Sequence, residues 1–215
     1  MDDNKISLAT TRRLPLYYRC LSELNEKGED KVSSAVLERL LKIDAATVRR
    51  DFSYFGQMGR RGYGYDVKIL LELFNDVLKQ DTAANVAIVG VGNLGHALIN
   101  FKFHKTGNAR IKMAFDVNPE VVGTIQSEVP VYDINEIKQR VRDEKIEVAI
   151  LTVPNSQAQR VTDLLVEAGI KGIMNFTTEI IDVPYNVTIH DVDLSLELQA
   201  LIYSMDQRLK NTKKL

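Results

Sequence analysis

The first 80 residues place apolar side chains at helical spacing in four segments. The predicted helices cover residues 10–28, a short segment that starts at Ser33–Ser34, residues 45–55 and residues 66–79. Gly28 ends the first pattern. The Ser33–Ser34 hydroxyls and the Asp44 carboxylate suit the N-caps of the second and third helices. Two short helices joined by a turn of about three or four residues have helix-turn-helix spacing.

Residues 56–65 contain four glycines and directly follow the third predicted helix. Closely spaced glycines supply the backbone freedom of a tight hairpin. A hairpin in this place predicts the wing of a winged helix. The polar stretch 80–84 is the predicted boundary, so residues 1–80 are expected to form a first domain that binds DNA.

From residue 85 the pattern changes to apolar strands that alternate with amphipathic helices. The predicted strands cover residues 86–89, 111–116, 129–131, 148–153, 172–176 and 187–190. Helices are expected directly after the first strand and over residues 134–143 and 156–168. This alternation predicts an α/β fold, with a Rossmann-like parallel-sheet domain over residues 85–192.

Residues 193–215 end the chain with one more predicted helix, over 193–210. Its apolar stripe consists of Leu194, Leu198, Leu201, Ile202, Met205 and Leu209. Such a stripe has to be covered. We interpret it as docking on a second subunit. Packing on the helix's own domain is the alternative, and it fits the pattern equally well.

Composition narrows the class of protein. Hydrophobic residues make up 45% of the chain and charged residues 27%, which is ordinary for a globular protein. No run of 18 apolar residues is present, so a soluble cytoplasmic protein is expected. Cys20 is the only cysteine, and no Cys/His cluster suggests a metal site. Any redox sensing therefore has to act through a ligand.

A glycine motif follows the first strand of the second domain. It consists of Gly90, Val91, Gly92, Asn93, Leu94 and Gly95. A strand before it, a helix after it and an acid at the end of the next strand are the context of a dinucleotide site. In such a site, Gly90 permits the tight turn, Gly92 lets a pyrophosphate approach and Gly95 lets the helix pack closely. A purely structural turn is the alternative.

Asp116 lies 21 positions after Gly95 and ends the second strand. Its carboxylate can accept hydrogen bonds from ribose hydroxyls and would repel a 2′-phosphate, which favours NAD(H) over NADP(H). A strand-end cap is the alternative. Further candidates at the carboxyl edge of the sheet are Thr152, Val153, Pro154, Asn175 and Phe176. Asn175 and Phe176 could equally be buried packing residues.

No catalytic residue is predicted. A dehydrogenase needs a proton donor near the nicotinamide and a pocket for its substrate. The three histidines are His96, His104 and His190, and none has a position that suggests this role. A small NAD-dependent oxidoreductase with an N-terminal dimerisation domain remains the alternative to a sensor.

The third helix and the wing carry a local excess of arginine. Residues 47–65 contain four arginines and one acid, Asp51, although the net charge of the chain is -1. Arginine can contact guanine in a major groove or enter a minor groove. The predicted DNA contacts are Ser33, Ser34, Thr47, Arg49, Arg50, Ser53, Tyr54, Arg60, Arg61 and Tyr63. A solvated charged face is the alternative.

These motifs, in this order, resemble the Rex redox-sensing transcriptional repressors of bacteria. The matching stretches are residues 13–19, 48–56, 61–65, 90–95, 151–154, 169–173 and 192–194. The resemblance implies a homodimer with an N-terminal winged helix, a Rossmann domain and a C-terminal helix exchanged between subunits. It also implies repression at palindromic operators that is relieved when NADH replaces NAD+. A DNA-binding protein whose nucleotide is purely structural is the remaining alternative.

The resemblance also implies a redox switch. In the family an acid near the nicotinamide, matched here by Asp193, exchanges partners with an arginine of the first helix, matched by Arg19. The family's switch includes a tyrosine on the helix after the glycines. This chain has Phe101 there, so the tyrosine's part is not carried over.

Overall fold

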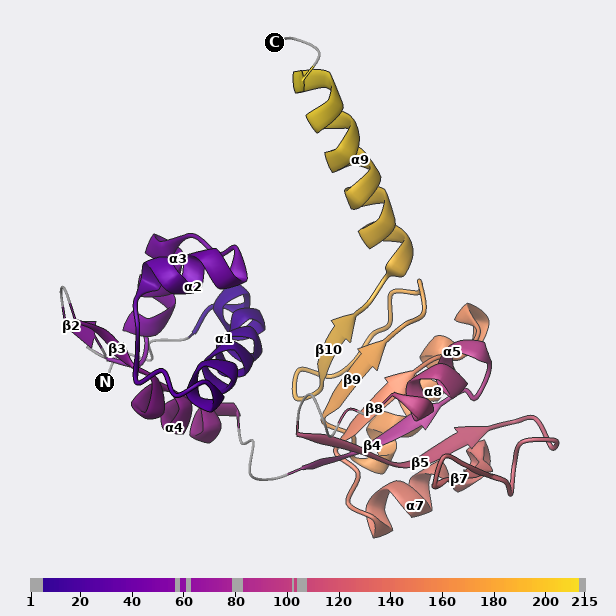
Figure 1. The fold of residues 1–215 in the computed structure, drawn as a ribbon. Coiled ribbons are helices and arrows are strands. Elements are labelled where there is room, and N and C mark those ends of the chain that lie inside the picture. Colours follow the sequence, from indigo (N-terminus) through magenta and orange to yellow (C-terminus); the bar gives the residue numbers. More distant parts are fainter. Residues whose placement is uncertain are drawn as a thin grey trace. The chain divides into compact units, whose positions relative to one another are not determined.

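The computed structural model describes residues 6–56, 59–60, 63–78, 83–101, 103 and 108–212 (Figure 1). The chain divides into two compact units, Met1–Thr82 and Ala83–Leu215. The division falls within the polar stretch from which the domain boundary was predicted.

The first unit is a winged helix. Its elements are α1 (Leu8–Glu26), β1 (Lys31–Val32), α2 (Ser34–Leu41), α3 (Ala45–Ser53), β2 (Gly59–Arg60), β3 (Gly64–Asp66) and α4 (Val67–Leu78). Ser33 accepts a hydrogen bond from the Val36 N–H, and Asp44 accepts from the second and third residues of α3, which confirms both predicted N-caps. Helix α1 begins two residues earlier than predicted because Ser7 caps it.

A small antiparallel sheet in the order β1-β3-β2 completes this unit. The pairing of β2 with β3 confirms the predicted hairpin. Strand β1 was not predicted, because two residues carry no readable alternation. Gly64 has a φ of +75°, and a Cβ there would lie 2.7 Å from the Val32 carbonyl oxygen, so the close approach of β1 requires glycine.

Aromatic rings form the centre of the first unit's core. The Phe52 ring of α3 lies 5.1 Å from Tyr17 of α1 and 5.5 Å from Phe74 of α4, centroid to centroid. All three side chains are buried. Full burial of each large side chain contributes about 1.5–3 kcal/mol. The inner side of α3 is thus attached to the core.

The second unit contains a seven-stranded sheet in the order β10-β9-β8-β4-β5-β7-β6. The strands are β4 (Ala84–Val89), β5 (Ala109–Asp116), β6 (Ile125–Gln126), β7 (Val129–Asp133), β8 (Val148–Leu151), β9 (Gly172–Asn175) and β10 (Thr188–Asp191). All neighbours are parallel except β6 and β7. The predicted Rossmann-like parallel sheet is confirmed, with the unpredicted β6 added at one edge.

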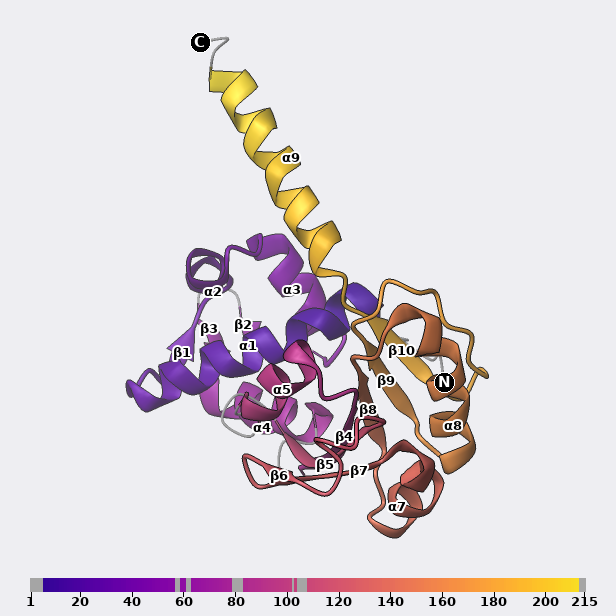
Figure 2. The same ribbon diagram turned by 90° about the vertical axis from the view of Figure 1, so that its right-hand side faces the viewer.

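Helices cover both faces of this sheet (Figure 2). They are α5 (Asn93–Asn100), α7 (Ile137–Asp143) and α8 (Ala158–Ala168), the last two preceded by short 3-10 turns at Ile134–Glu136 and Asn155–Gln157. Alternate residues of β4 enter two different cores. Ala87 and Val89 pack with α7 and α8, whereas Val86 and Ile88 pack with α5.

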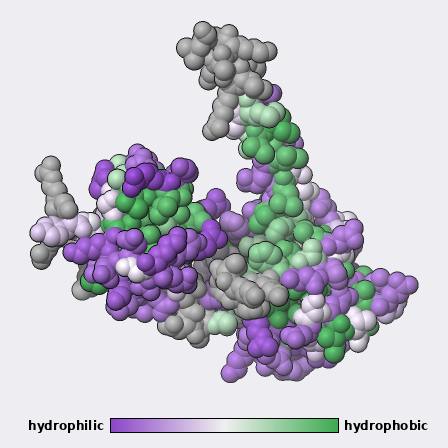
Figure 3. All heavy atoms as spheres, viewed as in Figure 1, coloured by the Kyte–Doolittle hydropathy of each residue, from purple (hydrophilic) through white to green (hydrophobic). Residues whose placement is uncertain are grey.

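Helix α9 (Leu194–Thr212) leaves β10 and extends from the sheet (Figure 1). Its apolar side chains from Leu194 to Met205 are 48% to 67% exposed, and they gather along the helix in Figure 3. From Leu194 to Met205, the helix's own domain does not cover these side chains. No helix in the described part of the chain is long and apolar enough to span a membrane.

Candidate nucleotide site and DNA-reading face

Two glycines of the motif are required by the protein's own packing. Gly90 has a φ of +97°, and a Cβ there would lie 2.6 Å from the Thr152 carbonyl oxygen. A Cβ at Gly95 would lie 1.9 Å from the Gly90 carbonyl oxygen. Both positions keep the turn after β4 closed against its neighbours, as the sequence motif predicted for the turn and the helix packing.

Gly92 is different, because nothing in the protein lies within 4 Å of the place a Cβ would take. Its φ of -71° is one that any residue can adopt. Gly92 is also the N-cap of α5, and no side chain caps that helix. An open backbone at a helix N-terminus suits an anion such as a pyrophosphate. The residues of the motif therefore fit a dinucleotide.

Asp116 lies directly against the glycine motif. Its Oδ2 accepts a hydrogen bond from the Val91 N–H at 2.5 Å, and its Oδ1 accepts from the N–H groups of Val117 and Asn118 at 2.7 and 2.8 Å. The carboxylate caps the end of β5, which agrees with the alternative prediction of a strand-end cap. Its place beside the motif is also the one that a ribose-binding acid needs.

The remaining candidates lie where strands of the sheet end. The Thr152 hydroxyl donates to the Gly90 carbonyl oxygen at 2.7 Å and so holds the glycine turn from the side of β8. Val153 and Pro154 follow at the same edge. Strand β8 ends at Leu151, so Thr152 and Val153 belong to the loop, although the strand was predicted to run to residue 153.

Asn175 is completely buried at the end of β9. Its amide nitrogen donates to Asp191 Oδ1 at 2.8 Å and to the Glu179 carbonyl oxygen at 3.1 Å, and its Oδ1 accepts from the N–H and the hydroxyl of Thr177. These bonds occupy the amide fully. Phe176 packs in the core on the α5 side. For both residues the geometry favours the packing alternative.

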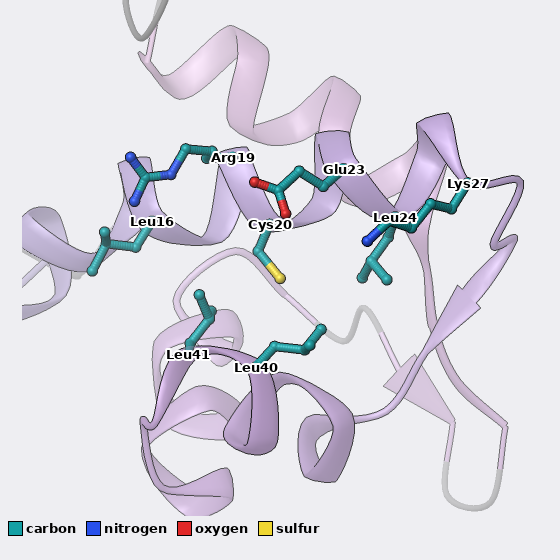
Figure 4. A pocket seen from close by; sticks show the side chains of 8 residues that line it. All are labelled: Leu16, Arg19, Cys20, Glu23, Leu24, Lys27, Leu40 and Leu41. Atoms are coloured by element: carbon teal, nitrogen blue, oxygen red, sulfur yellow. The ribbon is translucent and has the colours of Figure 1, made fainter.

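The three switch candidates lie on or beside three different helices. Asp193 Oδ1 accepts from the N–H groups of Ser195 and Leu196 and caps α9. Phe101 is the C-cap that follows α5 and is 53% exposed, and its ring centroid lies 4.7 Å from that of Phe103. Arg19 is an exposed residue of α1. It borders a cavity of about 260 Å³ between α1 and α2, into which Cys20 points (Figure 4).

The predicted DNA contacts on α2 and α3 are exposed or half-buried, and a hydrogen bond joins the two helices. Arg49 Nη1 donates to the Ser34 hydroxyl at 3.0 Å and so connects the recognition helix to the start of α2. Arg50 and Ser53 are exposed, and Ser33 is an exposed N-cap. Thr47 is half-buried on the first turn of α3. Helix α3 ends two residues before the predicted end. Tyr54 is therefore its C-cap, and the Tyr54 side chain is half-buried.

The wing adds Tyr63, which is 71% exposed. The Lys31 Nζ lies 5.2 Å from the centre of the Tyr63 ring, a cation–π contact between β1 and the wing. The sequence did not indicate this contact, because the two residues of β1 show no readable alternation. Arg61 and the side chain of Arg60 lie outside the described residues.

Asp51 lies in a place that the sequence did not predict. In the sequence it is the one acid among the four arginines of residues 47–65. In the structure its side chain is 1% exposed and faces α1. It accepts hydrogen bonds from Arg13, Tyr17 and Thr10, all residues of α1. Burial opposes its ionisation, but these hydrogen bonds outweigh burial and lower the pKa of Asp51. The exposed arginines of α3 therefore have no facing acid on their own helix.

Two family models match the two halves of the chain. The model described as "Putative DNA-binding protein N-terminus" matches residues 5–53, and the one described as "CoA binding domain" matches residues 81–179. The first corresponds to the winged helix and the second to the sheet domain.

Relatives match the chain over its whole length. It is 55% identical over 214 residues to the redox-sensing transcriptional repressor Rex of Lactobacillus gasseri, covering 100% of both chains. The repressor of the same name from Bacillus licheniformis is 52% identical over 203 residues, which cover 94% of each chain.

Solved structures agree in fold. The crystal structure of RSP in complex with β-NAD+ and operator DNA matches with a TM-score of 0.87 and 36% identity, over 97% of this chain and 96% of that one. RSP in complex with β-NADH matches with a TM-score of 0.86 and 34% identity, over 98% and 99%. RSP itself is described as a Rex-family repressor. The chain therefore belongs to the family of Rex redox-sensing transcriptional repressors.

Proposed function

We propose that this protein is a homodimeric transcriptional repressor of the cytoplasm that binds palindromic operator DNA and releases it when NADH binds. One observation carries the proposal. The same chain holds an open glycine turn with an acid beside it and a recognition helix whose exposed face is free of acids. The relative RSP has been crystallised with β-NAD+ and operator DNA and with β-NADH.

On the DNA side, α3 enters a major groove. Arg49 and Arg50 contact base edges or phosphates, and the hydroxyls of Thr47 and Ser53 contribute phosphate contacts. Ser34 fixes the Arg49 side chain before DNA arrives, which lowers the entropic cost of the contact. On the wing, the exposed Tyr63 reaches an adjacent minor groove, and Arg60 and Arg61 stay predicted contacts there.

On the nucleotide side, the backbone from Val91 to Leu94 and the N-terminus of α5 hold the pyrophosphate, and Asp116 holds the adenosine ribose. Thr152 keeps the turn in shape through its bond to Gly90. Val153 and Pro154 line the edge of the sheet where the nicotinamide lies. An apolar surrounding there disfavours the positively charged oxidised ring and so favours NADH.

The dimer forms through α9. The exposed stripe on this helix is too apolar to remain in water and is covered by a second copy of the chain, in an exchange of helices between subunits. Asp193, at the start of α9, and Arg19, on α1, then belong to the contact that changes between the DNA-bound and the free state. A ligand shifts that equilibrium only as far as its affinities for the two states differ.

The test uses the purified full-length protein and a fluorescent palindromic duplex selected with it from random-sequence DNA. Fluorescence anisotropy follows the duplex while NADH or NAD+ is added. We expect NADH to release the duplex at much lower concentration than NAD+. Equal effects of the two nucleotides, or none, contradict sensing. Steady consumption of NADH with a carbonyl substrate would instead favour an oxidoreductase.

A further inference from the structure

A buried carboxylate joins the recognition helix to the first helix of the DNA-binding unit. Asp51 lies on α3 between Arg50 and Phe52, yet its side chain turns away from the exposed arginines. All four of its hydrogen bonds come from α1. The nucleotide and DNA contacts proposed above use none of them.

The geometry around Asp51 is directional. Oδ1 accepts from the Thr10 hydroxyl at 2.9 Å and from Arg13 Nη2 at 2.7 Å. Oδ2 accepts from Arg13 Nε at 2.6 Å and from the Tyr17 hydroxyl at 2.6 Å. The Arg13 contact is bidentate, which fixes both distance and angle. The three donor residues recur at helical spacing, so they lie on one face of α1, and this face binds the Asp51 carboxylate.

Stability alone is a weak reason for such a cluster. A well-packed apolar group often replaces a buried ion pair without loss of stability. The rings of Phe52, Tyr17 and Phe74 already hold α3 against the core. What the apolar contacts lack is direction, since they allow a helix to slide or turn. The four hydrogen bonds fix the rotation and the register of α3 on α1.

Helix α1 also carries Arg19, exposed six residues after Arg13. Arg19 and Arg13 lie on one continuous helix, although Pro15 falls between them. A displacement of α1 at Arg19 therefore reaches Asp51 along a rigid element. Helix α3 moves with α1 only if the hydrogen bonds between Asp51 and α1 stay intact.

We propose that Asp51 is a positioning residue that fixes the orientation of α3 on α1, so that operator affinity depends on the position of α1. The proposal rests on the proposed function, because it names the element that transmits the response to NADH. Arg13 is its main partner, and Tyr17 and Thr10 complete the connection.

The experiment compares Asp51→Asn with Asp76→Asn in the full-length protein. Asp76 is an exposed residue of α4, so its replacement makes the same chemical change away from the cluster. Operator affinity is measured with and without saturating NADH, and the ratio of the two is the response factor. We expect Asp51→Asn to weaken operator binding by about tenfold or more, a free-energy change of at least about 1.4 kcal/mol. We also expect its response factor to fall towards one.

NADH affinity of the free protein, measured by nucleotide fluorescence, should match the wild type in both variants. Tyr17→Phe keeps the ring contacts and removes one hydrogen bond, so it should give an intermediate response factor in a folded protein. It keeps the test valid if Asp51→Asn folds poorly.

Three results decide against the proposal. Wild-type operator affinity in folded Asp51→Asn would remove any positioning role. Weaker operator binding by Asp51→Asn with an unchanged response factor would show that Asp51 does not transmit the NADH signal. An unchanged response factor in folded Tyr17→Phe would have the same meaning. If wild-type protein itself ignores NADH, the proposed function fails, and the loss of affinity in Asp51→Asn still tests the positioning of α3.

Discussion

The glycine turn of the second unit and the recognition helix of the first prepare for their ligands in opposite ways. The turn works by leaving side chains out: Gly92 exposes backbone, while Gly90 and Gly95 hold the turn closed. The recognition helix works by projecting side chains, and its orientation depends on Asp51 and its partners on α1. A backbone site is therefore encoded in a few consecutive residues. A side-chain site also needs support from a distant part of the chain.

The largest effect is expected at Gly95. In Gly95→Ala the new methyl group meets the Gly90 carbonyl oxygen at a distance no real contact shows, and backbone cannot yield cheaply. We expect the second unit to lose more than about 3 kcal/mol of stability, beyond ordinary overpacking. Thermal unfolding followed by circular dichroism measures this. A melting profile like that of the wild type would mean that the turn can rearrange.

Gly92→Val tests another glycine of the same motif, where we expect the protein to fold but to lose nucleotide binding. Open space at this position lets the protein fold, while the side chain occupies the approach of the pyrophosphate. We expect NADH affinity to fall by at least about a hundredfold, or about 2.7 kcal/mol. Operator binding should persist and become insensitive to NADH. Release of this variant from DNA by NADH would contradict the site.

Arg13→Ala tests the support of the recognition helix. It leaves the buried Asp51 carboxylate without its cation, and breaking a buried pair costs about 3–5 kcal/mol. Because the Arg13 side chain is 26% exposed, we expect a smaller loss for the first unit, about 2 kcal/mol. Urea unfolding measures it. Arg12→Ala, an exposed neighbour on α1, is the matched control and should change stability little.

Arg50→Ala and Arg49→Ala should weaken operator binding and leave NADH binding intact. Loss of a good arginine contact to a base costs about 1–3 kcal/mol. Arg50 is exposed, whereas Arg49 is also held by Ser34, so Ser34→Ala should reproduce part of the Arg49 effect. Anisotropy titrations with the operator duplex give the affinities. A joint loss of both ligands would indicate unfolding and not a lost contact.

The smallest effect is a dependence of stability on pH. The hydrogen bonds to Asp51 lower its pKa in the folded state, so its contribution is present above the unfolded value of about 3.9. The contribution is lost as pH falls through the lower folded pKa. The stability advantage of the wild type over Asp51→Asn should therefore shrink below about pH 4. Urea unfolding at several pH values measures it, and a constant advantage would argue that Asp51 is not ionised.

Family membership confirms the expectation of a regulator in place of an oxidoreductase. That expectation rested on the absence of a placed proton donor and on the DNA-reading domain ahead of the glycine motif. The nucleotide-site and DNA-contact residues themselves stay predictions, and the variants above are their tests.

Local sequence determined much of this protein. Helical periodicity and the Asp44 cap located the recognition helix, and four glycines located the wing. The glycine motif predicted the closed turn after β4, and the spacing to Asp116 predicted an acid at the end of β5, because backbone freedom and strand order are encoded in neighbouring residues. Very short strands such as β1 and β6 were missed, since they exist only through their pairing partners.

The tertiary structure alone decided which polar residues face inward. Nothing in residues 47–55 says that Asp51 is buried, because its partners lie 34 to 41 positions earlier in the chain. The same holds for Asn175, whose amide is fully used by Asp191, Thr177 and Glu179. Periodicity assigns a side chain to a face of its own helix or strand. Whether a charge on that face meets water or a partner depends on contacts that only the folded chain brings together.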